Sequence, residues 1–390
     1  MQKRGFFRGI GKNVLILGFV SMLTDLSSQM VFPLIPLFLL SVLKSPAWVI
    51  GLIEGSAITT ASIFDALSGH WSDIAQKRKR FVFLGYGLST ITKPLFALAT
   101  VWPFVLITRI VERVGKGIRD APRDALIAES TTVKARGKAY GFQRSLDGIG
   151  SILGACAAYL LLDILGYRKL FLLTFIPGFF TVLLILFVKE KKRIKYYKKE
   201  KLKIGLKNFP LNLKLFIIMS AVFYLGNFGY TFLLLKAKDI GVQDSSAVLM
   251  YILFYVVYSL FTIPAGLLSD KLGRKPILLV GYALFTITSI GLVFSTSLLS
   301  VVVFFAIFGV FFAAVDSVQR AFAVDLAPKR LKATALGTLH AAIGLVALPG
   351  GFIAGMLWDK ISPAATFIYG AVLAAIAIVM FFLCIKPKKR

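Results

Sequence analysis

Long apolar runs alternate with short polar pieces along the whole chain. Each run has roughly twenty residues, enough for a helix to cross about 30 Å of hydrocarbon. The first run has no small-residue cleavage pattern, so we expect it to remain as a helix rather than act as a secretory signal. The pattern predicts an all-α membrane protein with twelve transmembrane helices, near residues 13–40, 48–70, 81–101, 103–126, 136–162, 168–188, 213–236, 246–269, 276–296, 298–326, 331–356 and 364–385.

Composition supports a membrane protein. Of the 390 residues, 57% are hydrophobic and 16% are charged, and the mean hydropathy is +0.81. A soluble domain is about a quarter charged. The two cysteines, Cys156 and Cys384, both fall in predicted spans, so we expect neither a disulfide nor a metal-thiolate site.

The net charge of +28 would indicate nucleic-acid binding if it were gathered on one accessible face. Instead, 36 of the 46 Lys and Arg lie at the two termini and in every second connecting piece, including residues 113–138. The positive-inside rule places these pieces and both termini in the cytoplasm. We therefore expect an integral protein of the cell (inner) membrane that contacts anionic lipids on the cytoplasmic side and binds no nucleic acid.

The chain contains an internal repeat. GHWSD at 69–73 matches GLLSD at 266–270 at an offset of 197. Three further positions match at an offset of 196: Glu129 with Asp325, Gly141 with Gly337, and Gly154 with Gly350. The repeat predicts two pseudo-symmetric six-helix bundles, 1–188 and 213–390, joined by a basic linker, 189–212, with a substrate site where the bundles face each other.

The repeated loops carry a family resemblance. GHWSDIAQKRKR and GLLSDKLGRK resemble the Gly-x-x-x-Asp-(Arg/Lys)-x-Gly-Arg-(Arg/Lys) loop of the major facilitator superfamily. Arg109, twenty residues ahead of Glu129, is similar to the arginine of that family's fourth helix, although Arg113 stands where the family prefers glycine. The resemblance implies the fold of that superfamily, transport by alternating access and a monomer.

Asp73 and Asp270 lie at predicted helix ends beside basic residues. They can pair with these cations or face helix termini, in contacts that alternating access would make and break. Alternatively, the basic residues only hold the loops inside. The predicted gating residues are Asp73, Glu129, Arg136, Asp270, Arg274 and Asp325.

An ionisable side chain inside a span costs about 2.5–3.5 kcal/mol and needs a partner or a wet cavity. Arg144 and Asp147 at i,i+3, and Asp316 and Arg320 at i,i+4, can neutralise each other on one helix face. The glycines around Arg144 leave room for the pair to project into a cleft. The repeat places His340 opposite Arg144.

Asp25 is the predicted proton-coupling residue. It lies near the centre of the first span with no Lys or Arg within a helical turn, which suits a carboxylate that binds and releases a proton. The alternative is a structural carboxylate paired across helices with Arg109 or Arg144. Glu112, at i,i+3 from Arg109, and Asp147 are the other proton-coupling candidates.

Aromatic and amide side chains of the second half suit an amphiphilic organic solute. The predicted substrate-binding residues are Gln29, Arg109, Arg144, Tyr224, Asn227, Tyr255, Tyr258, Asp316, Arg320 and His340.

We therefore predict a secondary transporter of a small organic solute, driven by the proton gradient and without a cofactor or resident metal. An enzyme is not expected, because His70 and His340 are far apart and no catalytic triad or phosphate-binding loop is present. Two alternatives remain: an inorganic or metal cation carrier that uses Asp25 and Gln29, and a non-transporting scramblase or sensor.

Overall fold

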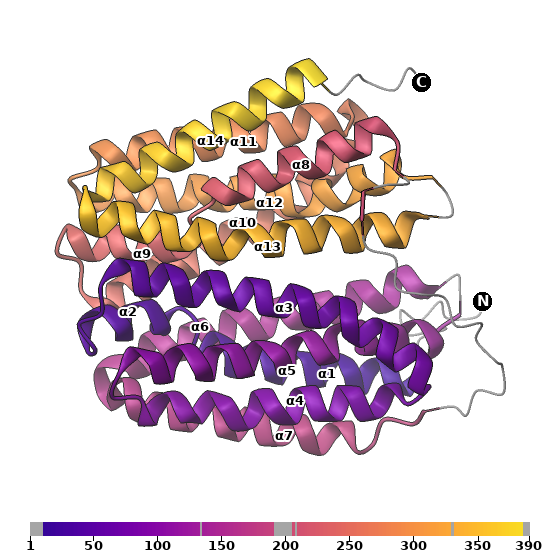
Figure 1. Cartoon of the computed structure of the whole chain (residues 1–390). Helices are drawn as coiled ribbons and strands as arrows, with labels where there is room; N and C mark the ends of the chain where they lie inside the picture. The colour runs from indigo at the N-terminus through magenta and orange to yellow at the C-terminus, as the bar shows by residue number, and fades with distance from the viewer. Residues whose placement is uncertain (1–10, 133–134, 191–204, 207–208, 329–330, 385–390) are drawn as a thin grey trace, which may run out of the picture. The chain divides into compact units, whose positions relative to one another are not determined.

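The chain folds almost entirely into helices (Figure 1). The computed structural model describes residues 11–132, 135–190, 205–206, 209–328 and 331–384. Most of the predicted linker lies outside these residues. The elements are α1 (Lys12–Gln29), α2 (Leu34–Ser41), α3 (Ala47–Ala75), α4 (Arg78–Leu95), η1 (Phe96–Leu98), α5 (Trp102–Glu129), α6 (Arg136–Leu173), α7 (Phe175–Ile185), α8 (Leu211–Gly226), α9 (Gly229–Asp239), α10 (Asp244–Leu272), α11 (Arg274–Phe294), α12 (Leu298–Leu326), α13 (Lys332–Lys360) and α14 (Pro363–Cys384).

Within the described residues, ten helical segments are long and apolar enough to cross a membrane. One of them, 136–185, changes direction at Gly166, where φ is 69° and ψ is 171°. Helix α5 is not among the ten because its many charges lower its hydropathy. These two features are consistent with the predicted twelve crossings, and the predicted all-α membrane fold is confirmed.

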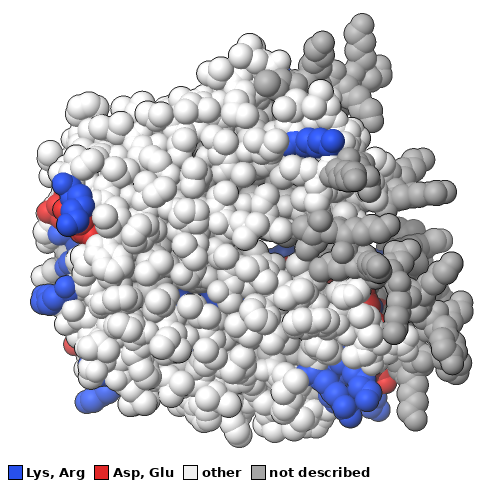
Figure 2. Space-filling view, in the orientation of Figure 1, with Lys and Arg blue, Asp and Glu red and all other residues white. Residues whose placement is uncertain are grey.

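Charged side chains avoid the middle of the helices on the face drawn in Figure 2. There the Lys, Arg, Asp and Glu of the described residues gather near the helix ends, and the surface between them is almost uncharged. An uncharged band of this kind suits contact with lipid hydrocarbon.

The chain divides into two compact units, which are described separately. Unit 1 comprises residues 1–34 and 60–202, and unit 2 comprises 35–59 and 203–390. The boundary therefore falls inside α3, whose first part belongs with α13. There the backbone amides of Ala47 and Trp48 donate to the Asp359 carboxylate at 3.0 and 2.8 Å.

Glycine makes this α3–α13 contact within unit 2 possible. A Cβ at Gly51 would clash with the carbonyl of Gly351, and a Cβ at Gly55 would clash with the backbone of Ala347 and Leu348. Small residues allow two helices to approach until their backbones touch.

The two units repeat one packing scheme. In unit 1, α1 packs on α6 and α7, and α4 packs on α5 and α7. In unit 2, α8 packs on α13 and α14, and α11 packs on α12 and α14. The first helix of each unit is followed by a break, at 30–33 and 227–228. The pseudo-symmetry expected from the sequence repeat is thus present in the helix pairing.

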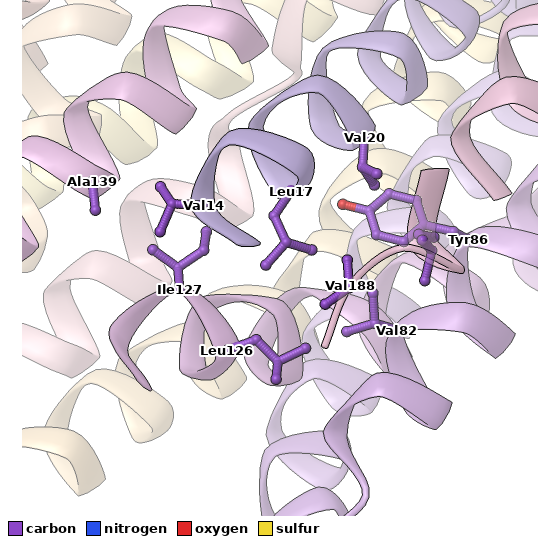
Figure 3. Packing of buried hydrophobic residues seen from close by; sticks show 10 residues of the cluster. Val14, Leu17, Val20, Val82, Tyr86, Leu126, Ile127, Ala139 and Val188 are labelled. Atoms are coloured by element: carbon purple, nitrogen blue, oxygen red, sulfur yellow. The ribbon is translucent and has the colours of Figure 1, made fainter. Parts of the chain in front are cut away.

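The α1–α6 contact positions the polar groups of unit 1. A Cβ at Gly150 would clash with the carbonyl of Met22, and a Cβ at Gly154 would clash with that of Leu26. These glycines hold the middle of α1, including Asp25, close against α6. Toward one end of the unit, an apolar cluster joins α1 to α4, α5 and α6 (Figure 3), made of Val14, Leu17, Val20, Val82, Tyr86, Leu126, Ile127, Ala139, Ile185 and Val188.

Candidate functional site

Helix α5 of unit 1 carries a column of charged side chains, which we call the α5 column. Helical spacing of three or four residues puts most of them along one side of the helix. The predicted span 103–126 and the predicted cytoplasmic piece 113–138 overlap at most of these residues; α5 continues to Glu129 and places the charges inside a helix. The column consists of Arg109, Glu112, Arg113, Lys116, Arg119, Asp120, Arg123 and Asp124.

One end of the α5 column is a buried triad. The carboxylate of Glu112 is fully buried and lies 3.6 Å from Arg109 Nη1 and 3.3 Å from Arg113 Nε. Both guanidinium groups also stack on the ring of Phe32, at 4.1 and 4.3 Å from its centroid. The expected Arg109–Glu112 contact is present, but sequence reasoning missed the part of Arg113. Two guanidinium groups thus compensate the buried charge of Glu112.

Three further cations lie near the middle of unit 1. Lys93 of α4 is buried and donates to Ser27 Oγ at 3.0 Å and to the Thr24 carbonyl at 3.4 Å. Arg119 is buried with its guanidinium 4.3 Å from the centroid of the Tyr86 ring. Lys116 forms no hydrogen bond or ion pair with the residues that the structure describes. None of these three was a predicted site residue.

Asp25 lies on α1 within electrostatic reach of this group. The charged side chains that act on it are Asp147 of α6 and Lys116, Arg119 and Arg123 of α5. Its carboxylate forms no hydrogen bond or ion pair within the described part of the chain. The alternative in which Asp25 pairs with Arg109 or Arg144 is therefore wrong for this structure.

A polar network lies beside Asp25. Ser21 Oγ accepts hydrogen bonds from Arg123 at 3.3 Å and from Gln143 at 3.1 Å. The Gln143 amide also donates to Asp147 at 2.5 Å. The predicted site residue Gln29 is buried at the end of α1. Helix α6 thus brings a second carboxylate next to Asp25.

The predicted Arg144–Asp147 pair is wrong. Asp147 accepts its hydrogen bond from Gln143, and the Arg144 side chain is exposed without an ion pair in the described residues. Residues 143 and 147 share a helix face because they are four apart, whereas residue 144 lies about 100° further round. The contact of α6 with α1 therefore places Gln143 and Asp147 in the polar network beside Ser21 and leaves the Arg144 side chain exposed.

Unit 2 contains a different polar group. Arg320 Nη2 lies 2.7 Å from Asp316, as the i,i+4 spacing predicted. The Tyr258 hydroxyl donates to Asp316 at 3.2 Å, and the Tyr224 hydroxyl donates to Gln319 at 3.3 Å. His340 of α13 lies within electrostatic reach of Arg320 and Asp316. The structure thus gathers most of the predicted substrate residues of the second half.

Aromatic rings continue this group along α10. The rings of Tyr251 and Tyr255 lie 5.1 Å apart, and those of Tyr255 and Tyr258 lie 6.1 Å apart, with Tyr230 of α9 at 4.8 Å from Tyr251. Asn227 has a backbone role, because its Oδ1 accepts from the Gly229 amide at the α8–α9 break. We call Tyr224, Tyr230, Tyr251, Tyr255 and Tyr258 the tyrosine group.

Five of the six predicted gating residues lie in two clusters, one in each unit. In the Arg78 cluster of unit 1, Arg78 pairs with Asp73 at 2.5 Å and with Glu129. In the Arg274 cluster of unit 2, Arg274 pairs with Asp270 at 2.7 Å and with Asp325 at 3.3 Å.

Two corrections concern the first cluster. Arg78 was missed by sequence reasoning, although the repeat offset of 196 points to it from Arg274. Arg136, which was predicted as a gating residue, is exposed at the start of α6 and belongs to neither cluster.

Comparison with known proteins identifies the family. A family model described as Major Facilitator Superfamily matches residues 17–235 and 215–390. The chain belongs to the Major Facilitator Superfamily. A curated protein of Methanocaldococcus jannaschii, described as an uncharacterized MFS-type transporter, is 42% identical over 378 residues, which are 95% of this chain and 94% of the relative.

Solved structures of Major Facilitator Superfamily transporters share the fold. A nucleoside transporter, NupG in a D323A mutant form, has a TM-score of 0.80 at 15% identity and covers 96% of this chain and 100% of its own. A D-xylose-proton symporter has a TM-score of 0.78 at 18% identity and covers 98% of both chains. The predicted family and fold are therefore confirmed.

Proposed function

We propose that this Major Facilitator Superfamily protein is a secondary active transporter. It moves a small organic solute across the cell membrane by alternating access and uses the proton gradient. The observation that carries the proposal is Asp25, a carboxylate in a membrane helix that forms no ion pair in the described residues and lies beside Asp147. Ionisable groups inside membrane spans are typical of proton pathways.

A proton on Asp25 changes the electrostatics of unit 1. Loss of its negative charge weakens the attraction to Lys116 and Arg119 and relieves the repulsion from Asp147. A change of one charge inside a low-dielectric unit is large enough to favour one conformation over another. The structural similarity to a protein named as a D-xylose-proton symporter agrees with this coupling.

The solute in this proposal contacts the tyrosine group and the Asp316–Arg320 pair of unit 2. Tyrosine rings supply apolar area and hydroxyl groups together, which suits an amphiphilic solute. The tyrosine rings adjoin the Asp316–Arg320 pair through the Tyr258 hydroxyl. Binding residues thus lie in unit 2, and the proton site lies in unit 1.

The orientation in this proposal follows the distribution of basic residues. Apart from Arg113, Lys116, Arg119 and Arg123, which α5 places inside a helix, the basic residues counted above lie at the termini and in alternate connecting pieces, so both termini and the Arg78 and Arg274 clusters lie on the cytoplasmic side in this proposal. Each cluster joins a helix end to its neighbours. We also expect a monomer to be sufficient for transport.

Proton movement in proteoliposomes tests the proposal with pools of candidate solutes. The purified protein is reconstituted with the pH dye pyranine inside, and pools of sugars, nucleosides, amino acids, carboxylates and amphiphilic drugs are added. We expect at least one pool to move protons with the wild-type protein and not with Asp25→Asn. Asp163→Asn is the matched control, because Asp163 is exposed on α6 without an ion pair in the described residues.

Two outcomes would count against the proposal. Solute-driven proton movement that survives in Asp25→Asn would remove Asp25 from the mechanism. A wild-type protein that moves neither protons nor radiolabelled solute with any pool would favour the non-transporting alternative.

A further inference from the structure

Helix α12 of unit 2 carries one acid and one base well inside its span. Asp316 lies ten residues before the end of the helix at Leu326, which is about 15 Å along the helix axis. Its carboxylate lies 2.7 Å from Arg320 Nη2 and accepts a hydrogen bond from the Tyr258 hydroxyl at 3.2 Å. The Asp316–Arg320 pair is therefore electrically neutral as a whole and presents one charge of each sign, one helical turn apart.

The Asp316–Arg320 pair is not sealed within unit 2. The Asp316 side chain is 29% exposed, and that of Arg320 is 47% exposed. Charged groups at this depth in a membrane helix face a partner or water, because exposure to hydrocarbon is costly. The exposed side of the pair therefore suits a surface of unit 2 that meets water and solute.

Aromatic rings from two helices adjoin the pair. The Tyr258 ring lies 5.3 Å from that of Phe312, which is one helical turn before Asp316 on α12. On α10, the Tyr255 ring lies 6.1 Å from the Tyr258 ring. All three rings are partly exposed, so an aromatic surface begins at the Asp316 carboxylate. Such rings pack against another aromatic ring, and their faces attract an ammonium group.

The residue before Arg320 has an unused hydrogen-bond donor. Gln319 is 3% exposed, and its Oε1 accepts from the Tyr224 hydroxyl at 3.3 Å. Its Nε2 makes no hydrogen bond with the residues that the structure describes. A buried amide donor without an acceptor is costly. A carboxylate that binds at this end of the pair would bring an acceptor.

The charges of the pair restrict the solute. A solute with a single charge can compensate either Asp316 or Arg320 but leaves the other without a partner, and uncompensated charge inside a membrane protein is costly. A zwitterion replaces the internal contact by two of the same kind, its ammonium group on Asp316 and its carboxylate on Arg320. Every charge then remains compensated, and the guanidinium group offers the carboxylate two parallel donors.

We propose that the Asp316–Arg320 pair and the rings beside it bind a zwitterion with an aromatic side chain, such as an aromatic α-amino acid. The inference rests on the proposed transport function and names the class of its solute. The ammonium group lies against Asp316 and the face of the Tyr258 ring, and the aromatic side chain packs on the exposed rings of α10 and α12.

Thermal unfolding of the purified full-length protein in detergent tests this class with matched probes. L-phenylalanine carries both charges, phenethylamine lacks the carboxylate, 3-phenylpropionate lacks the ammonium group, and L-alanine lacks the ring. L-tryptophan, tryptamine and indole-3-propionate repeat the comparison with a larger ring. We expect a saturable rise in the unfolding midpoint with L-phenylalanine or L-tryptophan, because a ligand that binds only the folded state stabilises it. Each analogue should bind about tenfold more weakly or worse, since it loses one ionic contact or the ring contact.

Three variants locate the binding. Arg320→Gln should weaken binding of the amino acid and make the amine the tighter ligand, because Asp316 then needs a cation. Asp316→Asn should do the reverse and favour 3-phenylpropionate or indole-3-propionate. This reversal of preference would not follow from a loss of stability alone. Lys360→Gln, which removes an exposed lysine at the end of α13, should leave all affinities unchanged.

The double variant Asp316→Asn/Arg320→Gln keeps the test decisive if a single variant does not fold. It leaves neither charge without a partner, so it should fold but lose the preference for the zwitterion. No saturable stabilisation of the wild type by either aromatic amino acid, equally tight binding of an analogue, or an unchanged preference in the variants would overturn the inference. Sugars or nucleosides that move protons in proteoliposomes while neither amino acid binds would overturn this solute class and leave the transport proposal standing.

Discussion

Helices α5 and α12 occupy the same place in the packing of the two units but have different side chains. Helix α5 packs on α4, and α12 packs in the same way on α11. At the repeat offset of 196, Arg109 corresponds to Phe305, Glu112 to Phe308, and Lys116 to Phe312. Phe305 and Phe308 are fully buried, and Phe308 and Phe312 contact the Phe254 ring.

The comparison of α5 with α12 shows which side chains this fold needs at the corresponding helix. An aromatic column supports the α12 packing, so the architecture does not need charges at this position. The α5 column is an additional feature of unit 1, in a place where each charge is costly. Its position within electrostatic reach of Asp25 agrees with the proposed proton site in unit 1.

The largest expected effect comes from breaking the buried triad. Glu112→Leu leaves Arg109 and Arg113 without their carboxylate and should destabilise unit 1 by about 3–5 kcal/mol, as for other buried ion pairs that lose one partner. Replacing all three together, Arg109→Met with Glu112→Leu and Arg113→Met, should recover most of that loss. Unfolding titrations in detergent measure both variants.

The triple variant tests whether α5 packs stably when the charges of its buried triad are replaced by apolar side chains, as at the corresponding positions of α12. If it were as unstable as Glu112→Leu alone, the charges would be part of the architecture of unit 1, and the interpretation of the comparison would be wrong. Phe308→Leu in unit 2 is the matched control, because it changes the corresponding position without leaving a charge unpaired.

The Arg78 and Arg274 clusters give an intermediate effect. The Arg78 side chain is 11% exposed, whereas that of Arg274 is 24% exposed and its two acids are more than half exposed. Arg78→Ala should therefore lower the free energy of unfolding by about 1–3 kcal/mol, because it leaves acids with less access to water. Arg274→Ala should lower it by less than about 1 kcal/mol, as for exposed ion pairs.

The dependence of these stability losses on salt concentration gives a further test of the difference between the Arg78 and Arg274 clusters. The effect of Arg274→Ala should shrink as sodium chloride is added, because exposed charges are screened, and that of Arg78→Ala should shrink less. Equal losses of stability at low salt would show that the two clusters are energetically equivalent despite their different burial.

Hydropathy and the repeat predicted the fold, since both depend on features spread over many residues. The helical spans follow from apolar length, and the matching helix pairs follow from the near-constant offset between the halves. Within one helix, spacing also predicted the Asp316–Arg320 contact, because i,i+4 side chains meet on one face.

The α5 column could not be found in the same way. The count of basic residues assigns Arg113, Lys116 and Arg119 to a cytoplasmic piece, although the predicted span 103–126 includes them and their helical spacing with Arg109 was visible in the sequence. Their burial depends on contacts with Phe32, Tyr86 and Glu112, which come from other turns and other helices. Such contacts are fixed by tertiary packing and not by local pattern.

The smallest expected effect concerns Arg144, where the sequence prediction failed. Arg144→Gln should change the free energy of unfolding by no more than about 0.5 kcal/mol, because the side chain is exposed without an ion pair in the described residues. Gln143→Leu, one residue away, should cost about 1–3 kcal/mol, since it removes donors to Ser21 and Asp147. The same unfolding titrations measure both. A loss for Arg144→Gln as large as that for Gln143→Leu would mean that Arg144 pairs with Asp147 after all, and the inward-facing side of α6 would have to be assigned differently.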